Sequence, residues 1–183
     1  MTTYKDQRVG IFIDVQNLYH SAKNLHNSRV NYKELIRHAL AGRKLIRAIA
    51  YVVKSEGVEG IAPAVVPAGT PGREASFFEA LKGAGLELRQ KDIQVYPGGM
   101  KKADWDVGMA VDAIRMCEFL DTIILVTGDG DFLPLVDYLK WGRGRVVEVV
   151  AFSRTTSGKL KEAADNFTPI EEIPKSLLKI REH

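Results

Sequence analysis

Cysteine is almost absent from this chain: Cys117 is the only one among 183 residues. A single cysteine excludes an internal disulfide and a zinc site built on a CxxC pair. Because secreted proteins commonly rely on disulfides, the sequence favours a reducing, cytoplasmic setting. Cys117 lies in a helical stretch with no catalytic signature nearby, so we expect it to be a small residue of the core.

Long hydrophobic runs are absent as well. No apolar stretch approaches the roughly 20 residues that a membrane-spanning helix needs. The first residues, MTTYKDQR, lack the apolar segment of a signal peptide. We therefore expect no membrane partner. With 45% hydrophobic and 27% charged residues, the chain can build a core, which argues against global disorder.

A strong excess of charge of one sign is lacking too. Lysine and arginine number 26 against 23 aspartate and glutamate, a formal net charge of +3. Such a mild excess does not by itself indicate a nucleic-acid ligand, so the distribution of charge is more informative. The acids gather in two short stretches, 104–112 and 129–131, and basic residues lie on both sides of them.

Apolar, β-branched stretches alternate with amphipathic ones along the chain. This alternation predicts an α/β fold: a three-layer α/β/α, PIN-like (Rossmann-like) domain with a mostly parallel sheet. We expect one domain over residues 1–173 and a charged tail over 174–183. The predicted strands, first to fifth, cover 9–13, 45–53, 86–96, 122–127 and 145–152. The predicted helices cover about 15–27, a stretch capped by Asn31, 73–83, 105–119, 132–141 and 157–166.

Three further details of this fold are predicted from the sequence. A strand order of 3-2-1-4-5 is expected, which makes the first and fourth strands neighbours. The stretch 57–72 is rich in glycine and proline and predicts a loop. In the helix over 105–119, we expect a buried stripe formed by Val107, Ala110, Val111 and Ile114.

Acidic side chains follow two neighbouring strands of the predicted sheet. Asp14 ends the first strand, Asp129 and Asp131 follow the fourth, and the helix over 105–119 brings Asp106 to the same edge. Ligands of doubly wound sheets bind at this edge. Clustered carboxylates repel one another unless a cation lies between them, and hard oxygen ligands suit Mg²⁺ or Mn²⁺ rather than zinc. The sequence therefore predicts a divalent metal site.

A plainer interpretation exists for each acid taken alone. Aspartate is common at helix N-termini because its side chain caps free N–H groups, so Asp104, Asp106 and Asp131 can each be only a cap. The combination is harder to explain in this way. A serine or threonine would cap as well as Asp14, and two acids stand at 129–131 where one would suffice.

Three blocks of the sequence resemble those of the NYN domain family, whose fold is similar to that of PIN-domain nucleases. Asp14-Val-Gln-Asn17 resembles the family's D-x-x-N signature, and the stretch from Lys102 to Asp112 looks like its central block. Thr127-Gly-Asp129-Gly-Asp131-Phe is similar to its S/T-G-D-x-D-F segment. The blocks occur in the family's order over about residues 8–155, and the LabA-like bacterial proteins are the most similar subgroup.

The resemblance implies an endoribonuclease that uses Mg²⁺ or Mn²⁺ and hydrolyses RNA phosphodiesters with a metal-bound water. It implies that Asn17 orients Asp14 or touches the RNA, and that Thr127 supports the cluster on the substrate side. A homodimer is a further expectation, since PIN-like folds often pair. The residues that it marks as catalytic and as metal ligands are Asp14, Asp106, Asp129 and Asp131.

Asp112 also matches the family's central block. It lies six residues after Asp106, so the two side chains point about 120° apart on a helix. We therefore expect a supporting or structural role for Asp112.

Other side chains near this edge are candidates for RNA contacts. Phosphate contacts are expected from Lys101, Lys102 and Arg154. Base stacking is open to Tyr19, Tyr96 and Trp105, although aromatic residues more often serve the core or its rim. No partner acid or metal triad accompanies the three histidines, which we expect at the surface: His20, His26 and His38.

Two other functions fit parts of the pattern. A non-catalytic RNA-binding regulator of the LabA type would use the same scaffold and basic rim, with the acids only binding a cation. A phosphatase of the haloacid dehalogenase type also has an aspartate after its first strand. That chemistry needs a second acid two residues later, where this chain has Gln16.

Overall fold

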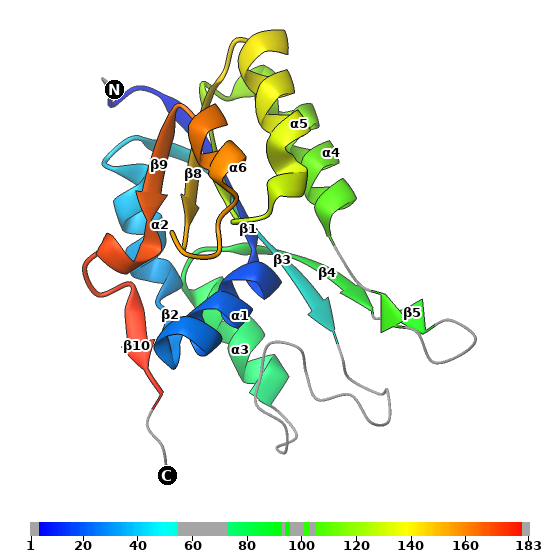
Figure 1. Ribbon diagram of the computed structural model, residues 1–183, viewed down its shortest axis with the longest axis vertical. Helices are drawn as coiled ribbons and strands as arrows, with labels where there is room; N and C mark the ends of the chain where they lie inside the picture. The colour runs from blue at the N-terminus through cyan, green and yellow to red at the C-terminus, as the bar shows by residue number, and fades with distance from the viewer. Residues whose placement is uncertain (1–3, 55–72, 93, 96–100, 103–104, 181–183) are drawn as a thin grey trace.

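A six-stranded parallel sheet forms the centre of the protein (Figure 1). The computed structural model describes residues 4–54, 73–92, 94–95, 101–102 and 105–180. The strands of the sheet are β1 (Arg8–Asp14), β3 (Lys44–Lys54), β4 (Glu87–Asp92), β7 (Thr122–Val126), β8 (Val146–Ala151) and β9 (Asn166–Pro169). Their order is β4-β3-β1-β7-β8-β9, which confirms the predicted order 3-2-1-4-5 and adds a sixth strand, β9.

Helices and two small antiparallel strand pairs complete the described fold. The pairs are β2 (Ser28–Val30) with β10 (Leu177–Lys179), and β5 (Gln94–Val95) with β6 (Lys101–Lys102). The helices are α1 (Val15–His26), α2 (Tyr32–Leu40), α3 (Arg73–Gly83), α4 (Asp106–Met116), α5 (Leu133–Asp137) and α6 (Gly158–Ala163). Shorter 3₁₀ turns cover Cys117–Phe119, Gly130–Phe132 and Ile170–Glu172, and a π-helical turn covers Tyr138–Gly142.

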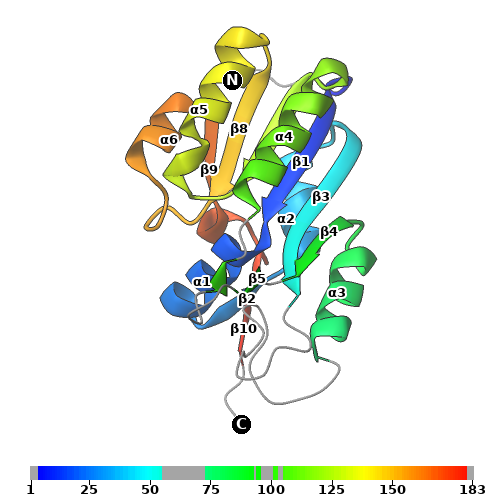
Figure 2. The ribbon, with the colours of Figure 1, turned by 90° about the vertical axis from the view of Figure 1, so that its right-hand side faces the viewer.

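Helices cover both faces of the sheet, which confirms the predicted three-layer architecture (Figures 1 and 2). On one face, Ile11 of β1 belongs to an apolar cluster with residues of α1, α2 and α3. On the other face, Phe12 belongs to a cluster with residues of α4, α5 and α6. Successive side chains of a strand point to opposite faces, so each buried strand feeds both halves of the core.

The register of β1 brings its end level with the loop that follows β7. Ile13 pairs with Val126 at the end of β7, and Asp14 pairs with Tyr51 of β3. Because all three strands run in the same direction, Asp14 and the residues after Val126 reach the same edge of the sheet. This is the edge at which the sequence places its acidic residues.

Helix α4 presents a different face to the sheet from the one predicted. Asp106, Met109 and Ala113 share one face by their spacing, and Met109 and Ala113 are buried. With that face turned inward, most of the predicted stripe points outward. The expectation is wrong for three exposed residues: Val107 at 75%, Val111 at 44% and Ile114 at 38% exposure.

The C-terminal part of the chain differs most from prediction. The helix predicted over 157–166 is shorter because Asp165 joins the chain to β8: its backbone N–H donates to the Val147 carbonyl at 2.8 Å, and its carboxylate accepts from the Val147 N–H at 2.8 Å. Residue 166 then begins β9. The segment 174–183, predicted as a charged tail, contains β10, which pairs with β2.

Two further predictions fall on residues that the structure does not describe. The loop predicted over 57–72 and the helix cap predicted at Asp104 lie outside the described residues. Within the parts of the chain that the structure describes, no helix is long and apolar enough to cross a membrane.

Candidate metal centre at the carboxyl edge of the sheet

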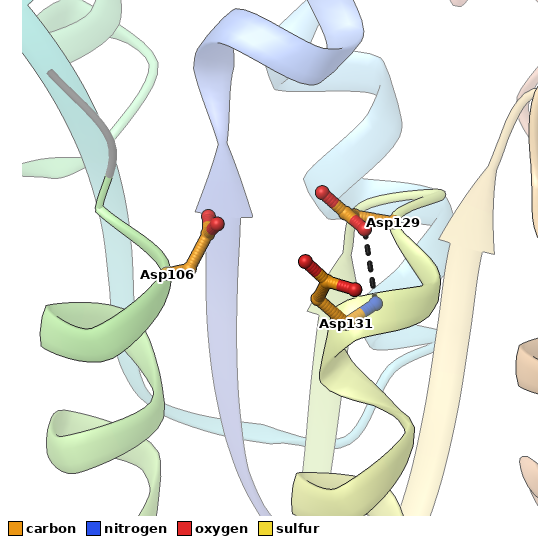
Figure 3. A group of neighbouring side chains, drawn as sticks. All are labelled: Asp106, Asp129 and Asp131. Carbon is orange, nitrogen blue, oxygen red and sulfur yellow. Dashed lines mark hydrogen bonds between the residues drawn. The ribbon is translucent and has the colours of Figure 1, made fainter. Parts of the chain in front are cut away.

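Three carboxylates meet at the carboxyl edge of the sheet (Figure 3). Asp106 is the first residue of α4, and Asp129 and Asp131 lie in the loop and 3₁₀ turn after β7. One oxygen from each side chain lies within 4.8 Å of the others. Asp106 and Asp129 are half-buried and Asp131 is exposed, so the group opens to solvent on one side. We call these three residues the carboxylate trio.

The backbone after β7 gives two of these acids a fixed relation. Asp129 is the N-cap of the 3₁₀ turn, and its Oδ1 accepts the backbone N–H of Asp131 at 2.9 Å (Figure 3). The plainer interpretation assigned capping to Asp106 and Asp131, but here the cap is Asp129, and the N-cap of α4 is Trp105. The bond from Asp129 uses one lone pair of one oxygen, and a carboxylate has about four acceptor sites. Capping and metal binding by Asp129 are therefore compatible.

Thr127 connects this loop to the end of β1. Its hydroxyl donates to Asp14 Oδ2 at 3.2 Å and accepts the backbone N–H of Asp129 at 3.3 Å. A hydroxyl can donate and accept at once, so one side chain connects two acids. Thr127 is fully buried, so this hydroxyl supports the trio from behind rather than facing a substrate.

Asp14 stands beside the trio and not within it. It is the N-cap of α1, where its Oδ1 accepts the backbone N–H of Asn17 at 3.0 Å, and its Oδ2 accepts the Thr127 hydroxyl. Burial raises the pKa of the Asp14 carboxyl, and the charge of Asp129 adds to this effect, while the donors from Asn17 and Thr127 oppose it. Asp14 thus lies close enough to Asp129 to interact electrostatically.

Asn17 completes the network on the α1 side. Its side-chain oxygen accepts the backbone N–H of Gly128 at 3.0 Å, while its own backbone N–H binds Asp14. Through its side chain, Asn17 therefore joins the start of α1 to the loop after β7. The resemblance implies that Asn17 orients Asp14 or touches the RNA, but its side chain bonds to the Gly128 N–H, and only its backbone N–H binds Asp14.

The turn after β8 packs directly on this loop. The Ser157 N–H donates to the Gly128 carbonyl at 3.1 Å, and a Cβ at Gly128 would lie 2.9 Å from Thr156 Oγ1. Glycine is therefore required for this close approach. Arg154 lies in the same turn and is exposed.

The other predicted contact residues differ in how far the structure describes them. Lys101 and Lys102 form β6, of which only the backbone is described, and Tyr96 lies outside the described residues. Tyr19 is half-buried, with the Lys23 ammonium 5.7 Å from its ring centroid. The expectations of surface histidines and a buried thiol are confirmed for His20, His26, His38 and Cys117.

Asp112 has a supporting role, as its spacing predicted. Its Oδ2 accepts the Tyr51 hydroxyl at 3.0 Å and lies 3.4 Å from Arg89 Nε. Burial and the adjacent Asp112 charge raise the pKa of the Tyr51 hydroxyl, which keeps it a hydrogen-bond donor. Asp112 thereby links α4 to β3 and β4 and is not a member of the trio.

The donor set of the trio fits a hard divalent cation. It consists only of carboxylate oxygens, and such oxygens suit Mg²⁺ and Mn²⁺. The partly exposed position leaves room for water and substrate oxygens, which Mg²⁺ usually retains as ligands.

Comparisons with known proteins give one family match and two similar proteins. Residues 8–171 match the sequence profile of the NYN domain. The low amplitude and bright protein LabA of Synechococcus elongatus is 21% identical over 179 residues, which span 93% of this chain and 87% of LabA. A Vibrio parahaemolyticus protein of unknown function has a similar crystal structure, with a TM-score of 0.81, 30% sequence identity, and coverage of 97% of this chain and 100% of that one.

Proposed function

Because this chain belongs to the NYN domain family, a PIN-like nuclease family, we propose that it is a metal-dependent endoribonuclease that hydrolyses RNA phosphodiesters. The observation that carries the proposal is the carboxylate trio. Three acids from two separate segments supply oxygens within 4.8 Å of one another at the ligand-binding edge of the sheet.

The trio would hold Mg²⁺ or Mn²⁺ through Asp106, Asp129 and Asp131. A divalent cation bound there lowers the pKa of water and offsets charge on a phosphodiester. Asp14 acts from behind as a neighbouring charge and as the acceptor for Asn17 and Thr127. In this proposal Asp14 is a fourth acid of the site, whether it contacts the cation directly or through water.

Basic side chains near the trio would bind the RNA backbone. Arg154 is exposed on the turn that packs against Gly128, and Lys101 and Lys102 come shortly before Asp106 in the chain. Lysine and arginine contacts to phosphate position a nucleic acid without reading its sequence. The proposal therefore names RNA as the substrate class and no particular sequence.

A second candidate is a non-catalytic RNA-binding regulator of the LabA type. It is favoured by the similarity to LabA over 93% of this chain and by the position of Asp14 outside the trio, since three acids make a smaller ligand set than the four expected. In this alternative the acids bind a cation without supporting hydrolysis. A homodimer stays a prediction for either function, and sedimentation velocity tests it.

Cleavage of labelled single-stranded RNA in Mn²⁺ separates the two candidates. The nuclease proposal expects cleavage by the wild-type protein and a loss of about 100-fold or more in Asp129→Asn and Asp14→Asn, because several kcal/mol of charge stabilisation disappear. RNA binding, followed by fluorescence anisotropy, should persist in both variants. Asp137→Asn is the matched control, because Asp137 is an exposed acid of α5 outside the trio. Binding without cleavage by the wild-type protein, over several RNAs and metals, would favour the regulator.

A further inference from the structure

The N-terminus of α4 is held by an unusual residue. The N-cap position is Trp105, whose side chain makes no capping hydrogen bond to the helix. Its indole N–H instead donates to the backbone carbonyl of Val52 in β3 at 2.9 Å. Val52 lies one residue beyond the last β1–β3 pair, Asp14 with Tyr51. The helix start is therefore tied to the carboxyl end of a central strand by one long-range hydrogen bond.

Packing fixes the indole ring as well as its N–H. A Cβ at Gly108 would lie 2.6 Å from one ring carbon of Trp105 and 2.9 Å from another, so the ring lies against bare backbone. The Tyr51 ring centroid is 5.4 Å away, and the Lys91 ammonium is 5.8 Å from the ring centroid. These neighbours surround a half-buried ring, which favours an anchor over the base-stacking platform considered from the sequence.

Two separate parts of the fold position the carboxylate trio: one holds Asp129 and Asp131, and the other holds Asp106. Asp129 and Asp131 follow β7 and are held by the network of Thr127, Asn17 and the 3₁₀ turn. Asp106 comes from α4 and directly follows Trp105, so its position relative to the other two acids depends on where α4 begins.

We propose that Trp105 is a positioning residue for the metal site: its indole, bonded to Val52 and packed on Gly108, sets the location of Asp106 opposite Asp129 and Asp131. This inference rests on the proposed metal site. Residues that orient metal ligands change affinity by about 10- to 100-fold when they are altered, and a displacement of the α4 N-terminus would act in the same way.

Trp105→Phe tests the hydrogen bond, because phenylalanine keeps an aromatic ring and loses the N–H donor. Gly108→Ala tests the packing, because the new methyl group must displace the ring or the helix. Mn²⁺ affinity is measured by isothermal titration calorimetry on the full chain, and the electron paramagnetic resonance spectrum of bound Mn²⁺ reports its ligand environment. Each variant should weaken Mn²⁺ binding by about 10-fold or more and alter that spectrum.

Trp141→Phe is the matched control, since Trp141 is 81% exposed and lies in the π-helical turn after α5. It should bind Mn²⁺ like the wild-type protein. A purely structural role for Trp105 predicts a lower urea midpoint in Trp105→Phe and Gly108→Ala with unchanged Mn²⁺ affinity and spectrum, and that result would overturn the inference.

The wild-type titration separates this inference from the proposed function. If the wild-type protein binds Mn²⁺ and Asp106→Asn abolishes binding while both anchor variants bind normally, the metal site stands and the role of Trp105 is refuted. If the wild-type protein binds no Mn²⁺ at this site, the proposed function and this inference are both overturned.

Discussion

At the scale of single residues, the buried hydroxyl of Thr127 links two acids of the site. It donates a hydrogen bond to the Asp14 carboxylate and accepts one from the Asp129 N–H. Thr127→Val keeps the shape and removes the hydroxyl, leaving both groups without this partner. Loss of a buried partner costs about 1–3 kcal/mol, and urea denaturation of the metal-free protein should show a decrease of that size. Thr127→Ser keeps the hydroxyl and should lose less. Equal losses in the two variants would contradict the role given to the hydroxyl.

Asp121 gives a pH-dependent prediction at the opposite edge of the sheet. The Arg8 guanidinium, 2.8 Å from its carboxylate, lowers the pKa of Asp121 to about 2. A carboxyl whose pKa is lower in the folded state than its unfolded value of about 3.9 stabilises the fold above that value. This stabilisation is lost as the pH falls through the folded pKa of about 2.

The wild-type protein should therefore exceed Asp121→Asn in free energy of unfolding at neutral pH. The difference should shrink between about pH 4 and pH 2. Urea titrations of both proteins at several pH values measure it. A difference that stays constant over this range would argue against the ion pair as its source.

The contacts of Asn17 and Trp105 could not be predicted from the sequence, whereas the grouping of the acids could. The gathering of Asp106, Asp129 and Asp131 could be expected, because acids that follow parallel strands or begin the adjoining helix share one edge. The bonds of Asn17 to Gly128 and of Trp105 to Val52 join residues far apart in the chain. No local sequence pattern predicts such bonds. Asp14 shows both cases: its Oδ1 caps the N–H of Asn17 three residues on, which is a local pattern, whereas its Oδ2 finds Thr127 only in the folded protein.

At the scale of elements, the contact between the loop after β7 and the turn after β8 is a tight one. A Cβ at Gly128 would lie 3.2 Å from the Thr156 Cα and 2.9 Å from its Oγ1, so Gly128→Ala must move backbone. Overpacking of this kind costs about 1–3 kcal/mol and would also shift Asp129. Gly158→Ala is the control, because nothing lies within 4 Å of its Cβ position. Urea denaturation should separate the two variants, and equal stabilities would contradict the tight fit.

A buried ion pair joins the end of α2 to β8. Arg43 binds Glu148 through two hydrogen bonds of 2.7 and 2.9 Å, with side-chain exposures of 2% and 7%. Glu148→Ala leaves a buried charge without its partner and should destabilise the fold by about 3–5 kcal/mol. The double variant Arg43→Met/Glu148→Leu removes both charges and should lose much less. Chemical denaturation measures both, and a double variant at least as unstable as Glu148→Ala would contradict this account.

Burial made most of the strands predictable. Four of the five predicted strands, β1, β3, β7 and β8, contain apolar runs buried in the parallel sheet, and such runs are distinct in sequence. The fifth, β4, is a polar and mostly exposed edge strand. Strand β9, Asn-Phe-Thr-Pro, is a half-exposed edge strand and has no such run. Helix α4 was predicted with the wrong buried face because Val107, Val111 and Ile114 are as apolar as the residues that the sheet covers.

At the scale of the whole molecule, a parallel sheet serves as the frame that brings distant acids together. The order β3-β1-β7 makes Asp14 and the loop after Val126 neighbours, and α4 delivers Asp106 from the same face as α5 and α6. The match to the NYN domain over residues 8–171 agrees with this arrangement, because it includes every acid of the site.

A crystal of the wild-type protein soaked in MnCl₂ tests the central claim most directly, through its anomalous difference map. The account predicts a peak in contact with carboxylate oxygens of Asp106, Asp129 and Asp131. A map with Mn²⁺ bound only elsewhere, or with no peak between these three side chains, would contradict it.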